Sequence, residues 1–125
     1  MRRSSLKQQK RILTIDDDQK VLEKIKTLLV HAGYAVCTLS SGDNIFEVVK
    51  SFAPDLILLD ALVPANLVEE TCKELKKTFD LPIVLLTAHS PKILKLECDA
   101  DYIVEKSFEN SELLKVVELQ LTEKV

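Results

Sequence analysis

Several short apolar segments of this sequence end in side chains that can bind a metal ion or a phosphate group. In chain order these side chains are Asp16, Asp17 and Asp18, then Asp60, Thr87 and Lys106. Crowded carboxylates repel one another, and a hard divalent cation such as Mg²⁺, which prefers oxygen ligands, relieves that repulsion. A carboxylate can also attack phosphorus to give an acyl phosphate, whose charge a cation, an ammonium group and a hydroxyl can stabilise. Brought together, these residues could carry out phosphoryl transfer to an aspartate.

Each of these residues also has a plainer interpretation when it is taken alone. Asp18 precedes an amphipathic stretch and is predicted to cap the helix that begins there. Asp16 or Asp17 alone could be a cap or a solvated charge. Thr87 could be an ordinary strand residue, and Lys106 a solvated lysine. Asp60 differs from these, because an unpaired acid that directly follows four apolar residues would be costly to bury. The functional interpretation therefore depends on a fold that collects the whole set.

Strands and helices are predicted to alternate along the chain. Strand-like segments cover residues 11–16, 34–39, 56–59, 83–86 and 102–104, and apolar residues recur at helical spacing in 20–32, 45–52, 68–79 and 113–121. This alternation is typical of a doubly wound α/β sheet. We therefore predict a five-stranded parallel sheet with helices on both faces and the strand order 2-1-3-4-5, counted along the chain. The candidate residues would then meet at the carboxyl edge of that sheet.

Length and composition fit one domain of ordinary character, with 125 residues, 46% hydrophobic and 30% charged. Residues 1–9 are predicted to be a disordered basic leader, and residues 10–122 a single domain. A net charge of −3 indicates no general affinity for nucleic acid or for an anionic membrane. No apolar run approaches the ~20 residues of a bilayer span and no secretory signal is visible, so a cytoplasmic location is predicted. The three cysteines lie far apart in the sequence and form no CxxC pair, so we expect no disulfide framework and no zinc site.

Four segments carry a resemblance to a known family. "RILTIDDD", "PDLILLDALVP", "LPIVLLTA" and "EKSF" resemble the signature segments of the receiver (CheY-like) domains of two-component response regulators, and the likeness runs from about Lys10 to Leu121. The resemblance implies a flavodoxin-like fold and Mg²⁺ as the cofactor. It also implies a histidine kinase or a histidine phosphotransfer protein as the phosphoryl donor, and a downstream output protein or domain as the receiver of the signal. No output domain is expected within these residues, and both a stand-alone protein and a part of a longer one stay open.

The same resemblance assigns a role to each candidate. Asp60 would accept the phosphoryl group, Thr87 would bond a phosphoryl oxygen, and Lys106 would pair with Asp60 or its phosphate. The metal ligands would be Asp16, Asp17, Asp60 and the backbone carbonyl of Leu62, with Asp17 the more direct ligand of the acidic pair. The domain would catalyse its own aspartyl phosphorylation, which makes it a signalling domain rather than an enzyme.

Departures from the family pattern affect the loops around the site. The loop after the phosphoacceptor lacks the usual glycines and has Ala65–Val68 instead. The stretch between Thr87 and Tyr102 is about four residues short, roughly one helical turn, so a helix around residues 92–97 is predicted to be stunted or irregular. Ser107 replaces the proline that usually follows the conserved lysine, which makes the reach of that lysine into the site less secure.

The last predicted strand is shifted by one residue relative to the family. Ile103 takes the position that is usually aromatic, and Tyr102 stands beside it. In the family, that aromatic side chain and the site threonine move together to report phosphorylation. We therefore predict that the phosphorylation chemistry is kept while the usual coupling to output is altered.

Two other classes of function compete with this hypothesis. A pseudo-receiver would keep the fold but act as a phosphorylation-independent interaction module. A stand-alone phosphatase that works through an aspartyl phosphate would need a second acid two residues after the nucleophile, where Leu62 stands. A nucleotide-binding domain is disfavoured as well, because no glycine-rich turn follows the first predicted strand.

Overall fold

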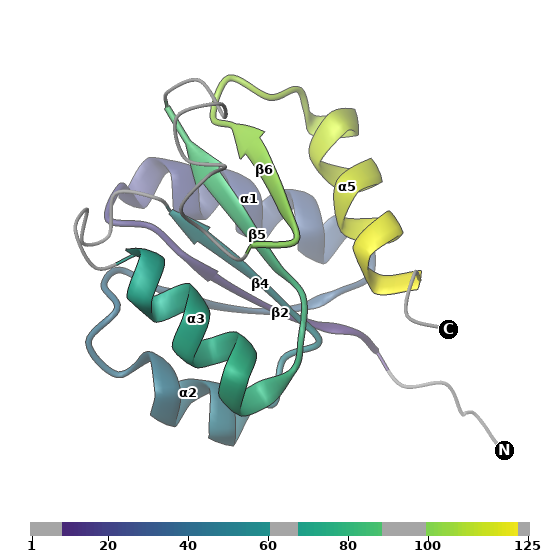
Figure 1. The fold of residues 1–125 in the computed structure, drawn as a ribbon. Helices are drawn as coiled ribbons and strands as arrows, with labels where there is room; N and C mark the ends of the chain where they lie inside the picture. Colours follow the sequence, from purple (N-terminus) through teal and green to yellow (C-terminus); the bar gives the residue numbers. More distant parts are fainter. Residues whose placement is uncertain (1–8, 61–67, 89–99, 123–125) are drawn as a thin grey trace, which may run out of the picture.

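A computed structural model describes residues 9–60, 68–88 and 100–122 and shows one parallel sheet of five strands (Figure 1). The strands are β2 (Arg11–Ile15), β3 (Ala35–Leu39), β4 (Leu56–Asp60), β5 (Ile83–Thr87) and β6 (Tyr102–Glu105). They lie in the order β3-β2-β4-β5-β6, and every neighbouring pair is parallel. Counted along the chain, this is the order 2-1-3-4-5. The predicted doubly wound α/β fold is therefore confirmed.

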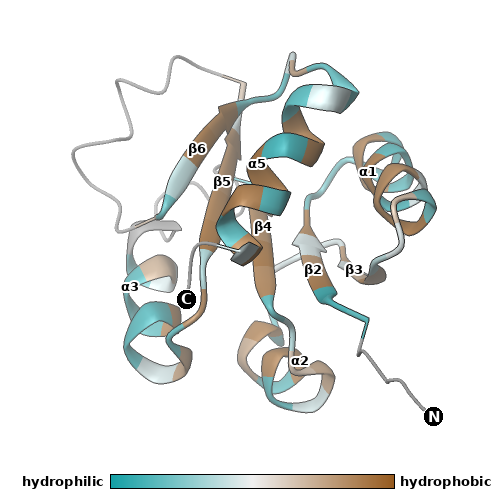
Figure 2. Cartoon of the chain, turned by 90° about the vertical axis from the view of Figure 1, so that its right-hand side faces the viewer, coloured by the Kyte–Doolittle hydropathy of each residue, from teal (hydrophilic) through white to brown (hydrophobic). Residues whose placement is uncertain are grey.

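Helices cover both faces of the sheet. They are α1 (Gln19–His31), α2 (Ile45–Phe52), α3 (Val68–Phe79) and α5 (Asn110–Thr122). The helices α1 and α5 share one hydrophobic cluster with the sheet, and α2 and α3 share the other (Figures 1 and 2). None of the helices in the described ranges is long and apolar enough to cross a membrane. The predicted irregular helix at 92–97 lies outside the described residues.

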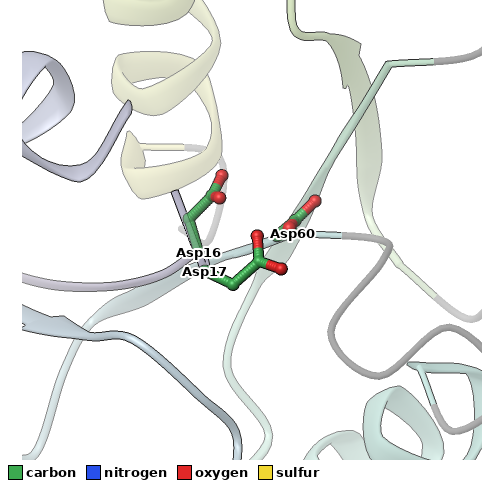
Figure 3. A group of neighbouring side chains, drawn as sticks. All are labelled: Asp16, Asp17 and Asp60. Atoms are coloured by element: carbon green, nitrogen blue, oxygen red, sulfur yellow. The ribbon is translucent and has the colours of Figure 1, made fainter. Parts of the chain in front are cut away.

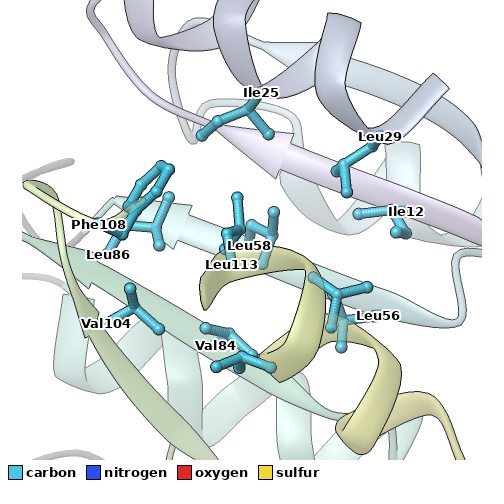
Figure 4. Packing of buried hydrophobic residues seen from close by; sticks show 12 residues of the cluster. Ile12, Ile25, Leu29, Leu56, Leu58, Val84, Leu86, Val104, Phe108 and Leu113 are labelled. Carbon is cyan, nitrogen blue, oxygen red and sulfur yellow. The ribbon is translucent and has the colours of Figure 1, made fainter. Parts of the chain in front are cut away.

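The interior strands β4 and β5 each supply both clusters because their residues alternate between the faces. In β4, Leu56 and Leu58 pack toward α1 and α5, while Ile57 and Leu59 pack toward α2 and α3. All residues of β4 and β5 are buried, as expected for parallel strands that are covered on both faces. Figure 4 shows the first cluster. Each fully buried leucine or isoleucine contributes about 1.5–3 kcal/mol, so the apolar runs hold the sheet that positions the polar strand ends.

Local signals set the ends of α1. The carboxylate of Asp18 accepts a hydrogen bond from the backbone N–H of Lys20 at 2.9 Å, which confirms the predicted N-cap. At the other end, Gly33 follows the C-cap residue Ala32 and has φ +102°, a conformation that favours glycine. Helix α1 therefore begins just after the acidic residues that follow β2 and ends shortly before β3.

Candidate functional site

The carboxyl ends of four strands meet at one edge of the sheet. Asp16 directly follows β2, Asp60 ends β4, Thr87 ends β5, and Lys106 directly follows β6. The ladder between β5 and β6 continues past the strands, because the backbone N–H of Lys106 donates to the carbonyl of Thr87 at 2.7 Å. Asp16, Asp60 and Thr87 are fully buried. The fold therefore collects residues that are up to 90 positions apart in the sequence (106 minus 16).

Three carboxylates form a cluster at this edge (Figure 3). One oxygen each of Asp16, Asp17 and Asp60 lies within 4.8 Å of the others, and Asp17 is the exposed member. Mg²⁺ binds oxygen ligands at about 2.1 Å in octahedral geometry, so opposite ligands are about 4.2 Å apart. The three oxygens are close to that spacing, and all are hard donors. The set fits a divalent cation, with Asp17 on the side that faces solvent.

Asp18, the third acid of the run, does not join this cluster. Its carboxylate caps α1, as described above. Asp16 contributes to the same turn, since its Oδ1 accepts a hydrogen bond from the backbone N–H of Asp18 at 2.9 Å. The backbone N–H of Asp16 donates to the carbonyl of Leu39 at 3.1 Å. Asp16 is therefore held by its backbone and by one carboxylate oxygen, and its other oxygen faces the site.

The ammonium group of Lys106 lies between the two buried carboxylates. Its Nζ is 2.9 Å from Oδ2 of Asp16 and 3.1 Å from Oδ1 of Asp60, and its side chain is 19% exposed. Burial by itself lowers the pKa of this lysine, but the carboxylates of Asp16 and Asp60 outweigh burial and raise the pKa above the ordinary value. Lys106 is thus firmly protonated at neutral pH, and it neutralises part of the charge of the cluster.

Two contacts of the following turn explain how Lys106 reaches the site without a proline after it. The backbone N–H of Phe108 donates to the carbonyl of Glu105 at 3.1 Å, and the ring of Phe108 is buried in the cluster beneath α1 and α5. The peptide between Lys106 and Ser107 is trans, as are all the others in the described ranges. The expectation that Ser107 weakens the reach of Lys106 is therefore not met by this geometry.

The contact between Lys106 and Asp16 is the part of the site that the sequence analysis missed. The family resemblance implied a partner for Lys106 only in Asp60 or its phosphate. A signal was present, because Asp16 directly follows an apolar strand and a buried carboxylate needs a partner. Asp17, the next residue, is exposed and has less need of one.

Ile103 and Tyr102, neighbours on the shifted strand β6, lie on opposite faces of the sheet. Ile103 is partly buried and packs with the cluster beneath α2 and α3. Tyr102 is 47% exposed and lines a surface depression over α5 together with Glu112 and Leu119. The tyrosine therefore does not occupy the inward position beside the site. Leu62 and the loop residues 65–67 lie outside the described residues.

Comparisons with known proteins agree with the fold. The family model described as "Response regulator receiver domain" matches residues 12–118. The chain is 31% identical to the BeF3-activated N-terminal receiver domain of Klebsiella pneumoniae RstA, with a TM-score of 0.82 over 90% of this chain and 98% of that one. It is 25% identical to a response regulator receiver domain protein from Clostridium thermocellum, with a TM-score of 0.81 over 92% and 96%. A CheY-like receiver domain protein from Methanospirillum hungatei JF-1, 24% identical, shares the fold with a TM-score of 0.78 over 93% and 96%.

Proposed function

Since the chain belongs to the response regulator receiver domain family, we propose that it accepts a phosphoryl group on Asp60 from a histidine kinase or a histidine phosphotransfer protein. The observation that carries this proposal is the arrangement around that carboxylate. Asp60 is fully buried, its Oδ1 lies 3.1 Å from an ammonium group, and two further carboxylates lie within 4.8 Å. A buried acid at a charged strand edge is costly for stability alone, which favours a chemical role.

Mg²⁺ is the cofactor that the donor set supports. Asp16, Asp17 and Asp60 would hold it, with the backbone carbonyl of Leu62 as a further ligand by the family resemblance. When bound, the ion would neutralise charge on the phosphoryl oxygens. Asp17 would be the ligand that meets the ion first, because it is the exposed member of the cluster.

The chain's own residues would supply the rest of the transfer. A carboxylate oxygen of Asp60 would attack the phosphorus of the phosphohistidine, so that a P–O bond forms, the P–N bond breaks and the imidazole leaves. Lys106 would move with the new phosphate, since its ammonium already lies beside Asp60. The hydroxyl of Thr87, at the neighbouring strand end, would donate a hydrogen bond to a phosphoryl oxygen. The domain would thus catalyse its own modification and act as a switch rather than as an enzyme.

The signal would then pass to an output protein or domain. We propose that residues 10–122 form the receiver domain and that it works in the cytoplasm. Partners would be proteins rather than nucleic acid or membrane, in keeping with the net charge of −3. Residues 1–8 of the predicted leader lie outside the described residues.

Phosphorylation by acetyl phosphate tests the proposal without the unknown kinase. We expect a mass increase of one phosphoryl group in the presence of Mg²⁺, its loss with EDTA, and its loss in Asp60→Asn. Asp18→Asn is the matched control, because Asp18 belongs to the same acidic run but caps α1, a role that asparagine also fulfils. An unmodified wild-type chain under conditions that phosphorylate another receiver domain would contradict the proposal.

A second candidate is the pseudo-receiver, a docking module that works without phosphorylation. The exposed position of Tyr102 favours it, because the inward position that reports phosphorylation in the family is held by Ile103 here. The two candidates differ in the acetyl phosphate experiment, where a pseudo-receiver stays unmodified. If the chain is phosphorylated, the same feature instead indicates an altered coupling to output.

A further inference from the structure

The outer edge of β3 is open in the part of the chain that the structure describes. Figure 2 shows β3 at the border of the sheet, beside β2. Ala35 and Leu39 direct their backbone groups toward β2, since the N–H of Ala35 donates to the carbonyl of Lys10 at 2.9 Å and the carbonyl of Leu39 accepts from Asp16 at 3.1 Å. Backbone direction alternates along a strand, so Val36 and Thr38 direct their N–H and C=O groups outward. These groups can bond another strand.

In the part of the chain that the structure describes, this edge lacks three features that usually prevent strand pairing. Exposed edges are normally protected by charged side chains, prolines or bulges. The nine residues from Gly33 to Ser41 contain no charged residue and no proline. The opposite edge strand, β6, differs, because it contains the exposed Glu105 and is preceded by Asp101. The contrast singles out β3 as the edge that is suited to an uncharged, hydrogen-bonding partner.

We propose that β3 pairs antiparallel with β3 of a second copy of this chain, around a two-fold axis at Cys37. A two-fold axis presents the same surface on both copies, so an edge that is uncharged along its length meets an equally uncharged edge. In this register Val36 lies opposite Thr38 of the second copy, and each such pair exchanges both N–H···O=C bonds. A shift of one residue in either direction would pair one of these two residues with a loop residue instead. The register at Cys37 therefore satisfies the strand best.

The proposed register makes a specific statement about the cysteines. Cys37 would face Cys37 of the second copy as a non-hydrogen-bonded pair, with Cα atoms about 4.5 Å apart. This separation lies within the range that a disulfide can bridge, about 4.4–6.8 Å. Cys37 is partly exposed, whereas Cys72 is fully buried. A disulfide between the two copies of Cys37 would therefore reveal the pairing in an experiment. The pairing itself needs no covalent bond.

The first test is cross-linking in a chain with Cys72→Ser and Cys98→Ser, so that Cys37 is its one remaining thiol. Diamide takes two electrons and two protons from a pair of thiols, and we expect it to give a disulfide-linked dimer. Thr38→Pro removes the outward N–H at an edge position where proline is tolerated, and we expect the dimer to form at least about ten-fold more slowly. Thr38→Val keeps the N–H and is the matched control. Equal rates in all three chains would overturn the proposal.

A second test examines the register and does not depend on the proline variant folding. In a Cys37→Ser, Cys72→Ser, Cys98→Ser chain, Val36→Cys is mixed with Thr38→Cys before diamide is added. We expect the mixture to cross-link and each variant alone to cross-link at least about ten-fold more slowly. Cross-linking without this preference would contradict the register, and a monomer at all concentrations in sedimentation would contradict the dimer. Both tests are independent of Asp60, so their failure leaves the proposed phosphorylation untouched.

Discussion

Lys106 Nζ lies 2.9 Å from Asp16 Oδ2, slightly closer than the 3.1 Å that separates it from Asp60 Oδ1. The ammonium is thus shared between a proposed metal ligand and the proposed phosphoacceptor. Coulomb attraction holds it there strongly, because Asp16 and Asp60 are fully buried. The same position means that a bound divalent cation and Lys106 would act on the same carboxylates. The stability of the domain and its proposed affinity for a metal ion would therefore be linked through this lysine.

Replacing Lys106 by methionine should destabilise the domain. The change leaves the buried carboxylates of Asp16 and Asp60 without their ammonium partner, and removal of one member of a buried ion pair costs about 3–5 kcal/mol. Urea unfolding measures this loss, and Mg²⁺ should recover part of it by supplying positive charge to the cluster. Lys26→Met, an exposed change on α1, is the control and should stay within about 0.5 kcal/mol of wild type. A Lys106 variant as stable as the control would contradict the electrostatic role.

The contribution of Lys106 to stability should disappear at high pH. Its pKa in the folded chain is raised, so the lysine stabilises the fold fully below its unfolded pKa, and the contribution is lost as pH rises through the folded pKa. The difference in unfolding free energy between wild type and Lys106→Met should therefore be constant near neutral pH and shrink above about pH 10.4. Taking the difference cancels the titration of the other lysines. A difference that grows with pH would mean that folding lowers the pKa of Lys106, contrary to this prediction.

Asp17→Asn should weaken Mg²⁺ binding by at least about ten-fold, about 1.4 kcal/mol, because one charged oxygen ligand becomes a neutral one. Asp18→Asn should leave the affinity nearly unchanged, since Asp18 caps α1 and does not join the carboxylate cluster. Isothermal titration with Mg²⁺ measures both affinities. An equal loss of Mg²⁺ affinity in the two variants would indicate that only the overall negative charge matters and that Asp17 is not a specific ligand.

Thr14→Val should stabilise the domain. The hydroxyl of Thr14 is fully buried, and within the described ranges it has no hydrogen-bond partner. Valine has nearly the same shape without the unsatisfied group, so we expect a gain of about 1 kcal/mol. Thr38→Val, an exposed change at the position paired with Thr14 on β3, should change the stability by less than about 0.5 kcal/mol. Thermal unfolding of the two variants side by side checks the difference, and a destabilised Thr14→Val chain would mean that the hydroxyl has a partner.

The fold followed from features that are local in the sequence. The unbroken apolar runs at 56–59 and 83–86 predicted central parallel strands, and both are buried on each face in the structure. Once the strand order was predicted, the position of the polar strand ends at a common edge followed from topology alone. Asp16, Asp60 and Lys106 therefore lie at one edge because of the strand order, whatever their side-chain geometry.

The remaining features depend on contacts that a sequence does not display. Lys106 contacts both Asp16 and Asp60, and it directly precedes a turn whose Phe108 is buried in the core, a long-range packing contact. The trans peptide before Ser107 is compatible with that turn, although the family pattern suggested a weakened reach. The outward position of Tyr102 depends on the register between β5 and β6, in which it lies opposite Val84. Such a one-residue difference in register exchanges the faces on which side chains lie.

A crystal structure with Mg²⁺ and beryllofluoride, a mimic of the phosphoryl group, would show whether the side chains of the site act together on Asp60. We expect the beryllofluoride adduct on Asp60 and the ion on the oxygens of Asp16, Asp17 and Asp60. The ammonium of Lys106 and the hydroxyl of Thr87 should both contact the adduct. If no adduct forms on Asp60 at saturating reagent, the proposed phosphorylation is contradicted. A Lys106 that stays on Asp16 and leaves the adduct without a positive neighbour would contradict the proposed role of this lysine.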